Sequence, residues 1–179
     1  MPKNHAVVNT MHCTCVDVDA YKAVGIGEVD MDNGTFVSLD EIANNAGVIT
    51  GFEFKVKLPQ ANATGLWMVR TPVPGSSKLL EAHIYKDPRY FYNEKGEPMS
   101  LCYLNPGVDV IEVTGEAFAD GSTPKDQPTY KFASVNAQGK LVVAQNAPAQ
   151  GTYFDLLGKH HIDCGQELVP SYVLKCAKN

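Results

Sequence analysis

Cysteine and histidine gather near the two ends of the chain, and these residue types are well suited to chemistry. One cluster is His12-Cys13-Thr14-Cys15 and the other is His160-His161-Ile162-Asp163-Cys164. If the first and last strands pair, the two clusters meet, and Cys and His are the usual ligands of tetrahedral zinc. However, Cys-x-Cys in a strand lacks the Cys-x2-Cys spacing that usually holds zinc, and His160 and His161 point to opposite faces. We therefore favour small buried thiols and surface imidazoles over a metal site.

No other pattern in the sequence is typical of an enzyme. Cys164 and His83 are conceivable as a nucleophilic pair, but no local signature accompanies either residue. Asp30 to Gly34 resembles the start of a calcium loop, yet the spacing of the later ligands fails. The chain has no glycine-rich phosphate loop, no Gly-x-Ser-x-Gly and no His-Glu-x-x-His. We expect no enzymatic activity, no metal and no cofactor.

An aromatic run with an arginine, Arg89-Tyr90-Phe91-Tyr92, lies in residues 87–118, the stretch that turn residues divide most clearly into segments. Aromatic and arginine side chains are favoured at the centres of protein interfaces. On a strand, Tyr90 and Tyr92 would share one face and Phe91 would point the other way. Two interpretations have equal weight: a partner-binding patch, or a core Phe91 with half-buried tyrosines.

Short strands separated by turns must position these residues. Asn33-Gly34 predicts a tight hairpin, and residues 39–43, with Ser38 as the cap, predict a single helical turn. The pattern predicts an all-β barrel or sandwich of short antiparallel strands with long loops and minimal helix. The main strands are expected, from apolar alternation and β-branched residues, at 21–26, 35–39, 48–58, 66–70, 99–104, 108–118, 130–135, 140–144, 153–163 and 171–175.

The segment from residue 48 to residue 58 alternates clearly. Phe52, Phe54, Val56 and Leu58 share one face, and the charged residues between them share the other. This period of two predicts a half-buried strand with its apolar face packed on the domain.

The first 20 residues differ in character from the rest of the chain. Residues 1–20 are predicted to be extended, either as an N-terminal arm or as a paired strand, because termini become ordered only when they are held down. Residues 21–179 are predicted to form a β-rich domain, with a boundary between two subdomains near 119–129 as one option. The proline-rich loop at 71–78, which holds Pro72 and Pro74, is a candidate partner contact.

Length and charge restrict the classes of function. The 179 residues suffice for one domain with a real core, and the net charge is −5 without a block of Lys or Arg. This balance argues against nucleic-acid binding, which requires several phosphates to be neutralised. No apolar run is long enough for a membrane span, and the polar start predicts no signal peptide. Five cysteines are then expected to be reduced thiols in a cytosol-like compartment.

The order of several motifs resembles that of small structural proteins encoded among the head genes of tailed bacteriophages. These motifs are Asn-Gly-x-Phe-Val at 33–37, Leu-Trp-Met-Val at 66–69 before a proline-rich loop, Asp87 with Phe91, Asn93-Glu94 and Gly96, Gly-x-Asp-x-Ile-x-Val-Thr at 107–114, and Gly-x-Leu-x-Val from Gly139. The resemblance covers most of residues 21–176 and leaves out the cysteine-rich start. It implies a capsid decoration, or cement, protein that is made in the host cytoplasm and binds the exterior of the virion. Its implied partner is the major capsid protein, and it implies a homo-oligomer on the capsid surface.

The expected capsid-contact residues are Arg89, Tyr90, Tyr92, Pro72, Pro74 and, in the N-terminal arm, His12. A small-ligand or glycan-binding β-domain is the alternative, with Trp67, Tyr90 and Tyr92 as a stacking platform. A metal-dependent β-barrel enzyme is a third class, which metal analysis of the purified protein would test.

Overall fold

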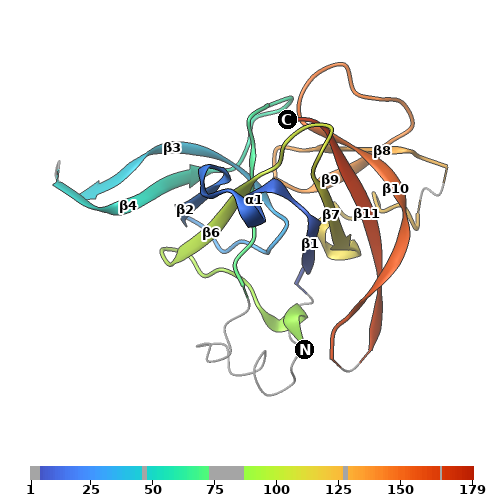
Figure 1. The fold of residues 1–179 in the computed structure, drawn as a ribbon, viewed down its shortest axis with the longest axis horizontal. Helices are drawn as coiled ribbons and strands as arrows, with labels where there is room; N and C mark the ends of the chain where they lie inside the picture. The colour runs from blue at the N-terminus through green and yellow to red at the C-terminus, as the bar shows by residue number, and fades with distance from the viewer. Residues whose placement is uncertain (1–4, 46–47, 73–86, 127–128, 166) are drawn as a thin grey trace.

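The computed structural model describes residues 5–45, 48–72, 87–126, 129–165 and 167–179. Within these ranges the chain forms two packed layers of β-strands, a small closed barrel and a six-stranded sheet (Figure 1). The all-β class predicted from the sequence is confirmed.

The barrel closes in the order β2-β4-β3-β5-β6. Its strands are β2 (Lys22–Gly27), β3 (Phe36–Asn45), β4 (Val48–Lys57), β5 (Trp67–Val69) and β6 (Pro98–Tyr103). Neighbours are antiparallel except for β2 and β4, which run parallel. Pairing of β2 with β6 closes the ring and satisfies the backbone groups that an open edge would expose.

The sheet has the order β1-β7-β11-β10-β8-β9, with all neighbours antiparallel. Its strands are β1 (Val8–His12), β7 (Val110–Thr114), β8 (Phe132–Val135), β9 (Leu141–Ala144), β10 (Tyr153–Asp163) and β11 (Leu168–Lys178). Helix in the described ranges amounts to α1 (Thr14–Asp17) and three 3-10 turns, η1 (Asp19–Tyr21), η2 (Pro88–Tyr90) and η3 (Gly115–Ala117).

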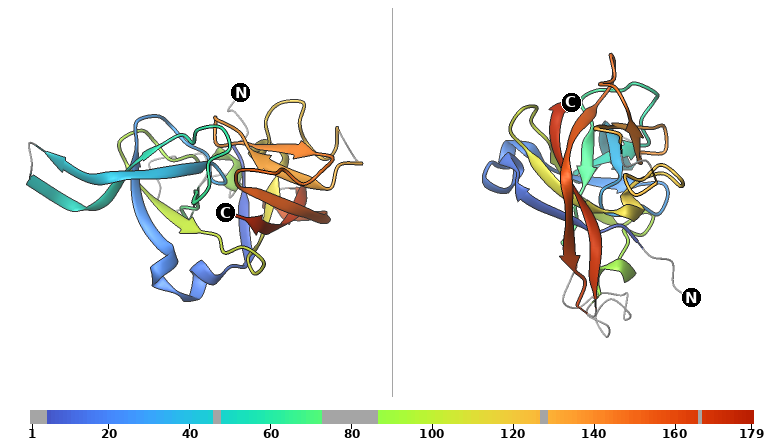
Figure 2. Two further views of the ribbon diagram at one scale, coloured as in Figure 1. Left: turned by 90° about the horizontal axis from the view of Figure 1, so that it is seen from above. Right: turned by 90° about the vertical axis from the view of Figure 1, so that its right-hand side faces the viewer.

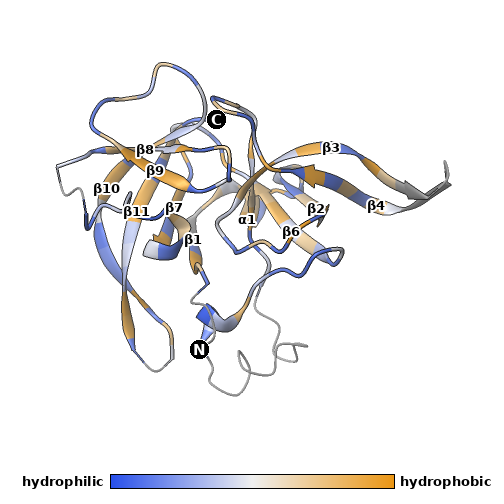
Figure 3. Ribbon diagram, turned by 180° about the vertical axis from the view of Figure 1, so that it is seen from behind, coloured by the Kyte–Doolittle hydropathy of each residue, from blue (hydrophilic) through white to orange (hydrophobic). Residues whose placement is uncertain are grey.

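One apolar core joins the two layers. Phe36 of β3 packs against Phe154 of β10 with ring centroids 5.3 Å apart, and both side chains are buried. Met68 of the barrel and Leu174 of the sheet belong to the same cluster. Burial of side chains of this size contributes about 1.5–3 kcal/mol each. Apolar residues recur along the strands that enclose this core (Figure 3).

The chain changes layer between β1 and β2 and again between β6 and β7. Residues 119–126, near the subdomain boundary considered from the sequence, follow η3 and lead toward β8, so they connect two strands of one sheet.

The N-terminal segment is held by the sheet. Val8 pairs with Val113 and Asn9 with Glu112, and the Thr114 N–H donates to the Val7 carbonyl at 3.0 Å. Of the two alternatives for residues 1–20, the described part takes the paired strand, followed by the short turns α1 and η1. The physical reason is that β7 would otherwise present an open edge.

The helical turn predicted over residues 39–43 is wrong. Strand β3 runs through this segment, where Leu39 pairs with Val56 of β4. Cross-strand pairing outweighs the weak local preference for helix.

The hairpin predicted at Asn33-Gly34 is also wrong, because β2 pairs with β4 and β6 and not with β3. The Asn33 amide is used for a different contact. It donates to the Thr71 carbonyl and accepts from the Thr71 N–H, both at 2.9 Å. The Asn-Gly turn is therefore a buried connection between barrel strands rather than the end of a two-stranded unit.

Candidate functional site

Strands β3 and β4 extend past the barrel and form a projecting ribbon. In the barrel, β3 pairs with β5 through residues 36–37, and β4 pairs with β2 through residues 54–56. Among the described strands, residues 38–45 therefore pair with β4 alone, and residues 48–53 pair with β3 alone. We name these two segments the β3–β4 ribbon. It reaches away from the body of the molecule in Figure 1 and in the left view of Figure 2.

A slip in the register of the ribbon places Phe52 outside. Ile42 pairs with Phe54, but the next pair is Asn44 with Ile49, so β4 carries extra residues between the two pairs. Extra residues in one strand form a bulge, which redirects side chains. Phe52 lies in this stretch and is 88% exposed. The prediction that Phe52 belongs to a packed face is therefore wrong.

Cross-strand ion pairs hold the base of the ribbon. Lys55 Nζ lies 2.7 Å from Glu41 Oε1, and Lys57 Nζ lies 2.5 Å from Asp40 Oδ2. The hydrogen bond from Lys57 lowers the pKa of Asp40. These pairs face solvent, so they fix register more than they stabilise the fold.

The ribbon has the properties of a docking element. A two-stranded ribbon alone is at best marginally stable in water. An aromatic side chain brings a large apolar area with little conformational entropy to lose, which is why aromatics are enriched at interface centres. Contact with another molecule would cover Phe52 and brace the ribbon.

The aromatic run predicted as a contact patch is mostly engaged within the chain. Residues 88–90 form η2, so the condition under which Tyr90 and Tyr92 would share one strand face is not met. Arg89 makes hydrogen bonds to Asp87 through both Nε and Nη2, the latter at 2.6 Å, and a second ion pair with Glu167. Phe91 is buried, as one of the two interpretations predicted.

The two tyrosines of this run are half-buried. Tyr90 ends η2, and the Tyr92 ring stacks on His5 with centroids 4.8 Å apart. Trp67, the third member of the predicted glycan platform, meets Tyr103 edge-on at 5.5 Å. Trp67 and Tyr92 thus have different ring partners, and no ring contact joins them within the described ranges.

The remaining predicted contacts lie elsewhere. Pro72 is exposed and lines a pocket beside the barrel, whereas Pro74 lies outside the described residues. His12 is the last residue of β1 and pairs with Val110. Pro72 and His12 thus lie in different parts of the fold from Arg89, which belongs to η2.

The histidine and cysteine clusters do not converge on a metal. All five cysteines are free and buried, as predicted. His160 binds Glu112 Oε1 through Nδ1 at 2.8 Å. In the part of the chain that the structure describes, no group of three or more His, Cys, Asp or Glu is arranged to hold a metal ion.

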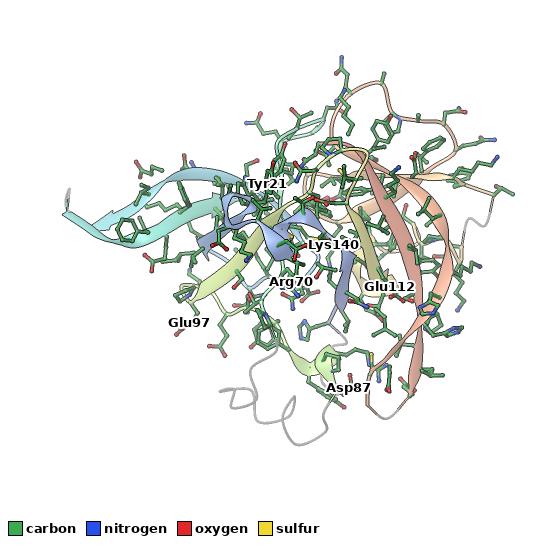
Figure 4. All side chains as sticks on the ribbon, in the orientation of Figure 1. Tyr21, Arg70, Asp87, Glu97, Glu112 and Lys140 are labelled. Atoms are coloured by element: carbon green, nitrogen blue, oxygen red, sulfur yellow. The ribbon has the colours of Figure 1, made fainter. Side chains whose placement is uncertain are left out.

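Glu112, on β7, is a buried charged residue that the sequence analysis missed (Figure 4). Its Oε1 accepts from Ser171 Oγ at 2.5 Å as well as binding His160, and Asn9 Nδ2 lies 3.4 Å from Oε2. In a nucleophilic triad the histidine stands between the serine and the carboxylate. Here the carboxylate stands between the serine and the histidine, so the order differs from that of a triad. The hydrogen bonds of Glu112 link β7 to β1, β10 and β11. The available signal was a charged residue at an interior position of an apolar strand, Ile111 to Val113.

Lys140, which is labelled in Figure 4, holds the barrel to the sheet. It lines an open groove of about 720 Å³. Its Nζ lies 3.1 Å from Asp32 Oδ2 and donates to the Glu116 carbonyl at 2.7 Å. His5 Nδ1 also binds Asp32, at 2.6 Å. Burial opposes the charge of Asp32, but the hydrogen bonds from His5 and Lys140 and their charges prevail and lower its pKa. The ion pairs at this groove are internal and join the two layers.

None of the helical segments in the described ranges has the length and apolar character that crossing a bilayer requires. Comparison with protein-family models, curated proteins and solved structures finds no match to the chain.

Proposed function

We propose that this protein is a structural component of a virion that binds the assembled capsid shell and stabilises it. The observation that carries the proposal is the β3–β4 ribbon, which extends past the barrel strands and bears Phe52 at 88% exposure. The resemblance of the motifs at 33–37, 66–69 and 107–114 to phage head proteins supports the same role.

The ribbon is a better candidate for the shell contact than the N-terminal segment. A free arm would add a strand to the sheet of a neighbour. Here the backbones of Val8 and Asn9 already pair with β7 of their own sheet. Arg89 is also occupied by Asp87 and Glu167, whereas Phe52 is exposed on a projecting element.

The proposed partner is the major capsid protein, bound by several copies of this chain. Full burial of one Phe side chain favours binding by about 1.5–3 kcal/mol. A ligand that binds only the assembled shell stabilises it by mass action. A homo-oligomer around a symmetry axis would place several ribbons on neighbouring capsid subunits, so that weak contacts add up.

Add-back binding tests this function. Shells of the major capsid protein from the same genome are prepared without this chain, mixed with the purified protein and sedimented. Saturable co-sedimentation and a higher temperature of shell disruption are expected. Absence of binding to shells, together with saturable binding on a glycan array, would instead establish the ligand-binding alternative.

A further inference from the structure

Three buried cysteines from distant parts of the chain meet beside α1. Cys13 precedes α1, Cys15 lies within it, and Cys102 comes from β6 of the barrel. The side chains of Cys102 and Cys13 both act on the thiol of Cys15 and shift its pKa. Cys15 is therefore the centre of the cluster.

A pocket of about 300 Å³ opens onto two of the three thiols. Cys15 and Cys102 line it, together with the cationic side chains of Arg70 and Lys22. Arg70 is labelled near α1 in Figure 4. The pocket gives a small polar reagent a route to thiols that are otherwise buried, and its cations favour an anion there.

Cys13 is placed differently from the other two. It does not line the pocket, and its Sγ donates to the Val110 carbonyl at 3.3 Å. Of the two thiols that neighbour Cys15, only Cys102 shares the pocket with it. Cys102 is therefore the natural partner of Cys15.

The surroundings of Cys15 favour its thiolate. Interaction with the Cys102 thiol, and after it with the Cys13 thiol, lowers the pKa of Cys15; the charge of Arg70 acts in the same direction, while burial and Asp109 oppose them. The thiolate is the form that attacks oxidants and disulfides.

We propose that Cys15 and Cys102 form a redox site that closes to a disulfide when hydrogen peroxide enters the pocket. The Cys15 thiolate attacks one peroxide oxygen, the O–O bond breaks, and Cys15 becomes a sulfenic acid while hydroxide leaves. The Cys102 sulfur then attacks the Cys15 sulfur, the S–O bond breaks, and the hydroxyl leaves as water with the Cys102 proton. In total, two thiols and one peroxide give a disulfide and two waters.

The disulfide would lock the two layers of the fold. It would join β6 of the barrel to the segment that follows β1 of the sheet. Because the closed loop spans residues 15–102, the midpoint of thermal unfolding is expected to rise by about 10 °C. This inference does not depend on the proposed shell-binding function.

Peptide mapping of the oxidised protein tests the site. The folded full-length chain is treated with hydrogen peroxide, remaining thiols are blocked during denaturation, and the digest is analysed without reduction. A Cys15–Cys102 disulfide is expected, with a higher unfolding midpoint that dithiothreitol reverses. This measurement uses the wild-type chain, so it holds even if a variant fails to fold.

Variants separate the roles of the three thiols. Cys102→Ser should leave a sulfenic acid on Cys15 that dimedone traps, whereas Cys13→Ser and the remote control Cys176→Ser should still form the disulfide. The proposal is overturned if Cys15 stays a free thiol while other cysteines are oxidised, or if Cys13 rather than Cys102 is its disulfide partner.

Discussion

The backbones of Gly139 and Phe36 touch where the sheet meets the barrel. The Phe36 N–H donates to the Gly139 carbonyl at 2.9 Å, and a Cβ added to Gly139 would lie 2.3 Å from the Phe36 oxygen. Gly139 also has a φ of +71°. Both the left-handed conformation and the close approach require glycine at this position.

Gly139→Ala is expected to lower the free energy of unfolding by about 3 kcal/mol, because the added methyl group meets backbone that cannot move aside cheaply. Gly96 is the matched control: its φ is +77°, but nothing lies within 4 Å of an added Cβ. Gly96→Ala should cost about 1 kcal/mol, from backbone strain alone. Urea unfolding measures the free energy of unfolding of both variants. Equal decreases for the two would show that the close approach of Gly139 to Phe36 adds nothing to the cost of the substitution.

The Glu112 cluster is expected to be important for stability. Glu112→Ala removes a buried carboxylate that binds Ser171 and His160, and it leaves the Ser171 hydroxyl without its acceptor. The free energy of unfolding should fall by about 2–4 kcal/mol. The exposed Glu28→Ala is the control and should change stability by less than about 0.5 kcal/mol. If Glu112→Ala lowers the free energy of unfolding no more than Glu28→Ala does, the Glu112 hydrogen bonds do not stabilise the sheet.

Stability in acid is expected to depend on Asp87. Burial opposes its charge, but the hydrogen bonds from the Arg89 side chain and backbone and the Arg89 charge prevail, so its pKa is lowered. A carboxyl group whose pKa falls on folding stabilises the protein fully above its unfolded pKa of about 3.9. That stabilisation is lost as the pH falls through the lower folded-state pKa.

Asp87→Asn should therefore lower the free energy of unfolding by about 2 kcal/mol at pH 7. The difference from wild type should shrink toward zero at a pH below the folded-state pKa. Urea unfolding at a series of pH values measures this, with the exposed Asp120→Asn as control. A difference between wild type and Asp87→Asn that is constant with pH would show that the Arg89 pair does not depend on the Asp87 charge.

The fold class was predictable because its signals are local. Alternation of apolar and polar residues and frequent turn residues identified most strands, including β4, β6 and β9. The errors arose where long-range pairing prevailed. Residues 39–43 have a local helix signal, but β4 supplies cross-strand partners for them, and Asn33-Gly34 has a hairpin signal, but its neighbours in space are Thr71 and Val69.

The candidate sites were less predictable, because each depends on geometry that no short segment encodes. Phe52 has the alternation of a packed residue, but it lies at a register slip in a ribbon that extends past the barrel, and it is exposed. Cys15 and Cys102 are far apart in sequence and line one pocket in the folded chain. Arg89 has the composition of an interface residue, but Asp87, two positions earlier, occupies it.

Shell binding by two surface variants tests the central claim most directly. Phe52→Ser removes the exposed aromatic of the ribbon, and Val108→Ser is the matched control, since Val108 is 63% exposed in the turn between β6 and β7. Both should unfold at the wild-type temperature, because neither side chain is packed. In add-back binding to capsid shells, Phe52→Ser should raise the dissociation constant about 10- to 100-fold, because the buried apolar contact is lost. Val108→Ser should bind as the wild type does. Equal binding by Phe52→Ser and wild type would contradict the ribbon as the shell contact.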